Sequence, residues 1–167
     1  MPRVVRLGRA ANDNTRPASL PAHLLAVAVA AGLAVATPGT LAGATTIVRA
    51  DDGDAEARCR ALAAQRVRLT EGRGNAADLA FVRCLNVLMA GEGRPEIAAS
   101  DKRLIAIAGE RAAWNGRTPD SWEHVMPYGV LSDEQHRLVA GGYAVRVAVP
   151  SGGGAAAHLI RSLGGRA

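Results

Sequence analysis

Aromatic residues are scarce in this sequence, making up only 3% of its 167 residues. A core with few rings has to come from alanine, valine, leucine and isoleucine, and it buries less apolar area per residue. The hydrophobic fraction of 49% still suffices for a core. A chain of this length indicates one domain at most. We therefore expect one small-residue core of modest stability.

Cysteine is scarce as well, and its spacing excludes two common uses. Cys59 and Cys84 are the only two, and they form no CxxC motif of the kind that binds zinc or carries out redox chemistry. Both lie in apolar helical contexts, where a thiol usually packs as a small hydrophobe. The sequence alone does not decide whether the two form a disulfide. The histidines are too dispersed to predict a metal site: His23, His124, His136 and His158.

Lysine is almost absent, since Lys102 is the only one among 20 basic residues. With 15 acidic residues the net charge is +5, and much of the excess lies in the N-terminal tail. The remainder of the chain is nearly balanced, and it lacks the basic groove interleaved with aromatics that single-strand binders use. The composition therefore predicts no nucleic-acid partner.

The first 44 residues divide into two segments. Residues 1–22 are polar, basic and rich in turn formers, which predicts a disordered tail. Residues 23–44 hold the apolar run LLAVAVAAGLAVA, which is shorter than the roughly 20 residues of a membrane span. One interpretation is an alanine-rich buried helix in a cytoplasmic protein. The other is a secretory signal segment, which would make the chain a small exported envelope protein that begins near Thr45.

From residue 45 onward, β-like runs alternate with helical ones. Alternation at this spacing predicts parallel βα units and an α/β fold. The first predicted helix starts near Asp54, Ser100 or Asp101 caps the third, and Ser132 caps the fourth. Leu79 belongs to the predicted buried side of the second helix. The predicted strands are 45–50, 66–72, 95–99, 122–130 and 143–149, and the predicted helices are 54–64, 76–90, 101–114, 132–142 and one from residue 155.

Four stretches of the sequence carry a resemblance to a known family. They are RVRLTEG (66–72), FVRCLNVLMAGEGRPEIAASDKRLI (81–105), SWEHVMPYGVLSDEQHRLVAGGYAVRVAVPSGGG (121–154) and HLIRSL (158–163). In order, they resemble five motifs from the C-terminal half of the proline dehydrogenase barrel. That TIM-like domain uses FAD to oxidise L-proline to 1-pyrroline-5-carboxylate.

The resemblance implies an incomplete barrel over residues 45–167, with about four to five parallel strand–helix units. A closed eight-unit barrel takes about 250 residues, which this chain does not have. Exposed strand edges have to be paired or covered. We therefore expect either a second copy of the chain or another partner at those edges.

On the flavin side, the resemblance assigns three residues. Arg68 matches an arginine that the family places beside the reactive edge of FAD. Glu71 stands where the family has a lysine near the flavin. Asp101 is the only acid kept from a Thr-His-Asp strand end, and we assign it with Arg68 to the catalytic group.

On the substrate side, three residues of the last predicted helix match the wall that holds proline. Arg161 keeps the first of two arginines that bind the proline carboxylate, Ser162 replaces the second, and His158 replaces a tyrosine. Two guanidinium groups bind a carboxylate through geometrically fixed, charge-assisted bonds, so losing one weakens binding. The substitutions predict a proline dehydrogenase-like chain that is catalytically impaired or inactive. The alternative is a non-catalytic half-barrel that binds itself or a partner.

Two further patterns in the sequence are compatible with chemistry. Glu123 and Asp101 are predicted at adjacent strand ends, where carboxylates can serve acid–base catalysis, although caps and ion pairs are the more common use. The stretch from Ser151 to Gly154 can cradle a phosphate or simply form a flexible loop.

Overall fold

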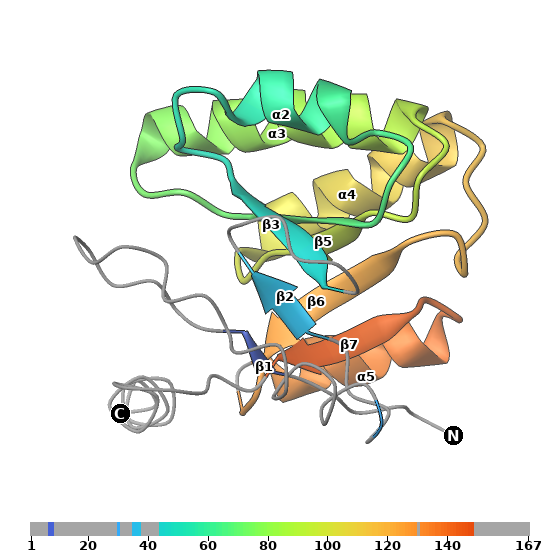
Figure 1. Ribbon diagram of the computed structural model, residues 1–167. Helices are drawn as coiled ribbons and strands as arrows, with labels where there is room; N and C mark the ends of the chain where they lie inside the picture. The colour runs from blue at the N-terminus through green and yellow to red at the C-terminus, as the bar shows by residue number, and fades with distance from the viewer. Residues whose placement is uncertain (1–6, 9–29, 31–34, 38–43, 130, 149–167) are drawn as a thin grey trace.

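The computed structural model describes residues 7–8, 30, 35–37, 44–129 and 131–148 (Figure 1). The described strands form one seven-stranded sheet in the order β1-β2-β3-β4-β5-β6-β7, with every pair parallel. The strands are β1 (Leu7–Gly8), β2 (Val35–Thr37), β3 (Thr45–Arg49), β4 (Val67–Thr70), β5 (Glu96–Ala98), β6 (Glu123–Pro127) and β7 (Val145–Ala148). The helices are α2 (Ala55–Ala61), α3 (Asn75–Ala90), α4 (Lys102–Trp114) and α5 (Ser132–Ala140).

The predicted alternation of strands and helices from residue 45 is confirmed. Each of α2, α3, α4 and α5 connects two neighbouring parallel strands, as a βαβ crossover requires. The sheet is open among the described strands, with β1 at one end of the strand order and β7 at the other. The α/β fold class and its incomplete, barrel-like character therefore hold.

Several local predictions were wrong. Residues 35–37 form β2 and pair with β3, although they fall in the segment for which a buried helix was considered. Ser132 is the first residue of α5 and not its cap, because the cap position is taken by Leu131 in a left-handed conformation (φ 54°). Leu79, placed on the buried side of α3, is 61% exposed, because it shares a helix face with the exposed residues Arg83 and Asn86.

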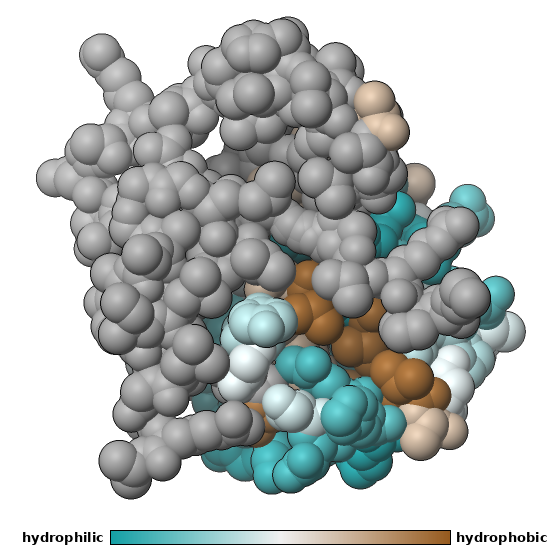
Figure 2. All heavy atoms as spheres, turned by 90° about the horizontal axis from the view of Figure 1, so that it is seen from below, coloured by the Kyte–Doolittle hydropathy of each residue, from teal (hydrophilic) through white to brown (hydrophobic). Residues whose placement is uncertain are grey.

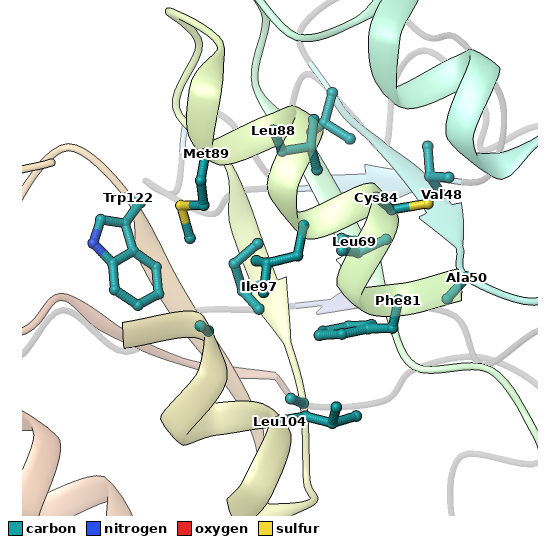
Figure 3. Packing of buried hydrophobic residues seen from close by; sticks show 14 of the residues in the cluster. Val48, Ala50, Leu69, Phe81, Cys84, Leu88, Met89, Ile97, Leu104 and Trp122 are labelled. Carbon is teal, nitrogen blue, oxygen red and sulfur yellow. The ribbon is translucent and has the colours of Figure 1, made fainter. Parts of the chain in front are cut away.

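The main hydrophobic core lies between the sheet and helices α2, α3 and α4. Side chains alternate along a strand, so Val67 and Leu69 of β4 face the helices while Arg66 and Arg68 face the other side. Figure 3 shows Phe81, Leu88 and other residues of α3 packed over Leu69 and Ile97. We call the sheet face opposite these helices the interior face.

Arg117, in the turn after α4, closes the end of α3. Its guanidinium donates to the carbonyl oxygens of Leu88, Met89 and Gly93 at 3.1, 2.9 and 2.9 Å, and also to that of Gly91. The last carbonyls of a helix lack partners within the helix, and a cation there satisfies them. No helix in the described part of the chain is long and apolar enough to cross a membrane.

Candidate functional site

At the carboxyl ends of β4 and β5, the Glu71 carboxylate is bound by the start of α4. Its Oε1 accepts hydrogen bonds from the backbone N–H groups of Ser100 and Asp101 at 2.7 and 2.9 Å, and its Oε2 accepts one from the Ser100 hydroxyl at 2.8 Å. Ser100 and Asp101 directly precede the first residue of α4, so Glu71 fixes the turn that leads from β5 into this helix.

Asp101, brought beside Glu71 by this contact, is the N-cap of α4. Its Oδ1 accepts the backbone N–H of Arg103 at 2.7 Å, and its Oδ2 pairs with the Arg103 guanidinium at 2.7 Å. The hydrogen bond from the Arg103 side chain holds the pKa of Asp101 below its usual range. The group is therefore a carboxylate at neutral pH and acts as a helix cap rather than a proton donor.

Arg68 lies on the interior face in the middle of β4 and is buried, with 6% exposure. Its Nε donates to Oε2 of Glu96 at 2.7 Å, and its Nη2 lies 2.6 Å from the same oxygen. Glu96, the residue opposite in β5, is completely buried. Burial alone would raise the pKa of Glu96, but the positive charges of Arg68 and Arg66 lower it overall. Both members of the pair are therefore charged.

A second carboxylate on the interior face binds three arginines. Oε1 of Glu123 receives Nη2 of Arg66 at 2.9 Å and Nη2 of Arg94 at 3.1 Å, and its Oε2 receives Nε and Nη2 of Arg146, each at 2.6 Å. Arg66 also donates from Nε to Glu96 at 2.7 Å, which joins the two carboxylates into one network. We call the set the arginine cluster; its members are Arg66, Arg68, Arg94, Arg146, Glu96 and Glu123.

The arginine cluster lies at the amino ends of the strands. Glu96 and Glu123 are the first residues of β5 and β6, and Arg66 directly precedes β4. Asp101 follows β5 at the opposite end of the sheet, so the predicted meeting of Glu123 and Asp101 was wrong. In parallel strands the amino end of one lies beside the amino end of the next, so Glu123 at the start of β6 and Asp101 after the end of β5 lie at opposite edges of the sheet.

Most of the arginine cluster was missed by sequence reasoning. Its members Arg66, Arg94, Glu96 and Arg146 were each interpreted only as parts of a strand or a turn. A signal was present, because a charged residue at alternate positions of an otherwise apolar strand has to face a polar interior. The partner of each charge, however, depends on strand register, which one sequence does not supply.

Three predicted site residues, Arg161, Ser162 and His158, lie outside the described residues. Of the other three, Glu71 and Asp101 are in contact, whereas Arg68 joins the arginine cluster. Cys59 and Cys84 are free thiols, both buried between α2 and α3, and contact with Cys84 together with burial raises the pKa of Cys59. Within the described ranges, no group of three histidine, cysteine or acidic residues is arranged to hold a metal ion.

The described residues assigned to FAD already have partners within the protein. Arg68 is held by the buried Glu96, and the Glu71 carboxylate occupies the amide groups at the start of α4. Arg68 keeps N–H donors beyond those that contact Glu96, whereas Glu71 places a negative charge where the family has a lysine. The described residues therefore show no flavin site.

An all-parallel sheet with strands in chain order, joined by helices, belongs to the class of βα-barrel-like α/β proteins. A solved structure of proline utilization A (PutA) from Bdellovibrio bacteriovorus, inactivated by N-propargylglycine, matches this chain with a TM-score of 0.64. The match has 20% identity and covers 74% of this chain, which spans only 16% of the PutA chain. Neither a family model nor a curated protein matches the sequence. The likeness establishes the fold alone: an open parallel sheet resembling part of a PutA barrel.

Proposed function

We propose that this chain is a proline dehydrogenase-like half-barrel that does not oxidise L-proline efficiently. Two independent likenesses support the family part of the proposal, namely the motifs between residues 66 and 163 and the fold shared with a proline utilization protein. The family reaction needs FAD, held at the carboxyl ends of the strands, and a proline carboxylate bound by arginine.

The observation that carries the loss of activity is that each assigned site residue of the described chain has a structural partner within the protein. Glu71 binds the start of α4, Asp101 caps the same helix, and Arg68 pairs with buried Glu96. Glu71 and Asp101 are engaged in holding the start of α4, and catalysis by a flavin depends on residues that orient the cofactor. On the substrate side, Ser162 stands in place of one of the two arginines that bind the proline carboxylate in the family.

The test is proline-dependent reduction of an electron-accepting dye by the purified full chain in the presence of added FAD. The expected result is a rate equal to that of buffer with free FAD. Two variants serve as controls. Genuine proline oxidation has to slow in Arg161→Gln, which removes the remaining arginine partner of the proline carboxylate. It has to stay unchanged in Arg60→Gln, which alters an exposed arginine of α2. Dye reduction that depends on Arg161 contradicts the proposal.

A second candidate is a non-catalytic half-barrel that binds a second copy of itself. It is favoured by β7, the last strand of the described order, in which all four residues are only half-buried. Apolar residues also reach the surface on the side of the molecule seen from below in Figure 2. An open edge of this kind usually needs a partner. Native mass spectrometry tests this candidate: a dimer supports it, and a monomer at all accessible concentrations contradicts it.

A further inference from the structure

The arginine cluster holds more positive than negative charge. Four guanidinium groups surround two carboxylates, and in the described part of the chain no other carboxylate lies within ion-pair distance of these arginines. Arginine remains protonated at neutral pH, and the arginine charges hold Glu96 in its ionised form. The cluster therefore carries a surplus of two positive charges.

The surplus is concentrated around Glu123. Arg66 and Arg94 share its Oε1, and Arg146 occupies Oε2, so three guanidinium groups converge on one carboxylate. Like charges this close repel one another unless an anion lies among them. Glu96 contacts Arg66 as well, but it is shared with Arg68, so the two carboxylates together compensate for two of the four arginines.

Some members of the arginine cluster are buried, and others are exposed to solvent. The side chains of Arg68 and Glu96 are 8% and 0% exposed, whereas those of Arg66 and Arg94 are 39% and 49% exposed. Each guanidinium has five N–H donors, and Arg94 uses only Nη2 in its contact with Glu123. Donors that face solvent are therefore left on Arg66 and Arg94.

We propose that Arg66, Arg94 and Arg146 form a binding site for a small oxyanion with two negative charges, such as phosphate. Guanidinium groups bind phosphate and carboxylate oxygens through paired, charge-assisted hydrogen bonds, and a dianion neutralises the surplus of this cluster. The site lies at the amino ends of the strands, away from Glu71 and Asp101, and it does not depend on the proposed proline dehydrogenase-like function.

The test follows the thermal unfolding midpoint of the full chain during a titration with sodium phosphate at pH 7. Sodium chloride at matched ionic strength is titrated in parallel. A ligand that binds only the native state raises the midpoint in a saturable way. We expect saturable stabilisation by phosphate and none by chloride, whereas equal shifts with both salts overturn the proposal.

Arg94→Gln is the decisive variant, because Glu123 keeps its contacts with Arg66 and Arg146 and the fold is retained. It should weaken the apparent affinity for phosphate about tenfold, which corresponds to about 1.4 kcal/mol. The matched control is Arg60→Gln, which removes an exposed arginine of α2 and should leave phosphate binding unchanged. Equal binding by the parent and Arg94→Gln overturns the proposal.

A succinate titration distinguishes phosphate from a dicarboxylate as the anion. A higher apparent affinity for one of the two anions, weakened in Arg94→Gln, supports the site and identifies its class of ligand. Failure of both anions to stabilise the protein beyond chloride overturns it.

Discussion

His124 shows how one buried residue makes stability depend on pH. It is 2% exposed between the rings of Trp122 and Tyr143, and its Nε2 has no hydrogen-bond partner within the described structure. Burial lowers the pKa of His124 from its ordinary value of 6.5 to about 4. The native state therefore resists protonation of this ring.

The unfolded chain binds this proton at a higher pH than the native state does. Above pH 6.5 the ring is neutral in both states and has no pH-dependent effect. As the pH falls from about 6.5 to about 4, protonation of His124 in the unfolded chain lowers the free energy of unfolding by about 3 kcal/mol in total. Denaturant unfolding at a series of pH values should show a smaller loss over this window in His124→Phe, which keeps a ring of similar size. Parallel pH profiles for the two proteins contradict this account.

Glu96 is the residue on which the arginine cluster depends most. Replacement by glutamine leaves Arg68 buried without a counter-charge, and breaking a buried ion pair in this way costs about 3–5 kcal/mol. The lowered pKa of Glu96 means that its contribution is present above the ordinary glutamate range and is lost as the pH falls through the folded pKa. Equilibrium unfolding of Glu96→Gln measures the loss.

The matched control for Glu96→Gln is Glu56→Gln, in an exposed pair with Arg60 on α2. Exposed pairs of this kind contribute between about 0 and 1 kcal/mol. If the two substitutions cost the same, the cluster is not a buried network.

At the scale of the element, the start of α4 depends on a residue outside the helix. Glu71→Gln keeps the shape of the side chain but removes the charge that the N–H groups of Ser100 and Asp101 bind. The expected loss is about 1–2 kcal/mol in the free energy of unfolding, since these are hydrogen bonds to a charged group. Glu110→Gln, on the exposed side of α4, should change stability little, and an equal effect of both variants refutes this role of Glu71.

The end of α3 depends in the same way on Arg117. Arg117→Met keeps a long apolar stem but removes the donors that reach Leu88, Met89 and Gly93. We expect a loss of about 2–3 kcal/mol in the free energy of unfolding, measured with denaturant, because several carbonyls lose a charged donor at once. Arg60→Met on α2 is the comparison. If Arg117→Met destabilises the protein no more than Arg60→Met does, this role of Arg117 is contradicted.

Elements were easier to predict than their contacts. Alternating runs such as the one from Val67 to Thr70 and the apolar spacing of α3 gave every strand–helix unit between residues 45 and 148. Element ends were less accurate, as at Ser132, because caps depend on local backbone conformation. The partners of Arg68 and Glu71 could not be predicted, since they lie on neighbouring strands and turns that only the folded register brings together.

At the scale of the whole molecule, the chain combines a barrel-like arrangement with predicted site residues that have structural partners within the protein. The helices bury a core against one face of the sheet, while the interior face holds the arginine cluster. A catalytic barrel places its free polar groups at the carboxyl ends of the strands. Here Glu71 and Asp101, which lie at that end, stabilise α4.

The visible absorbance spectrum of the full chain, purified after expression with excess flavin, tests the central claim most directly. We predict a colourless protein that is folded by circular dichroism and carries no flavin, because Glu71 stands where the family has a lysine near the flavin and is bound to the start of α4. A yellow protein with one flavin per chain, whose absorbance is lost in Arg68→Gln, would contradict it.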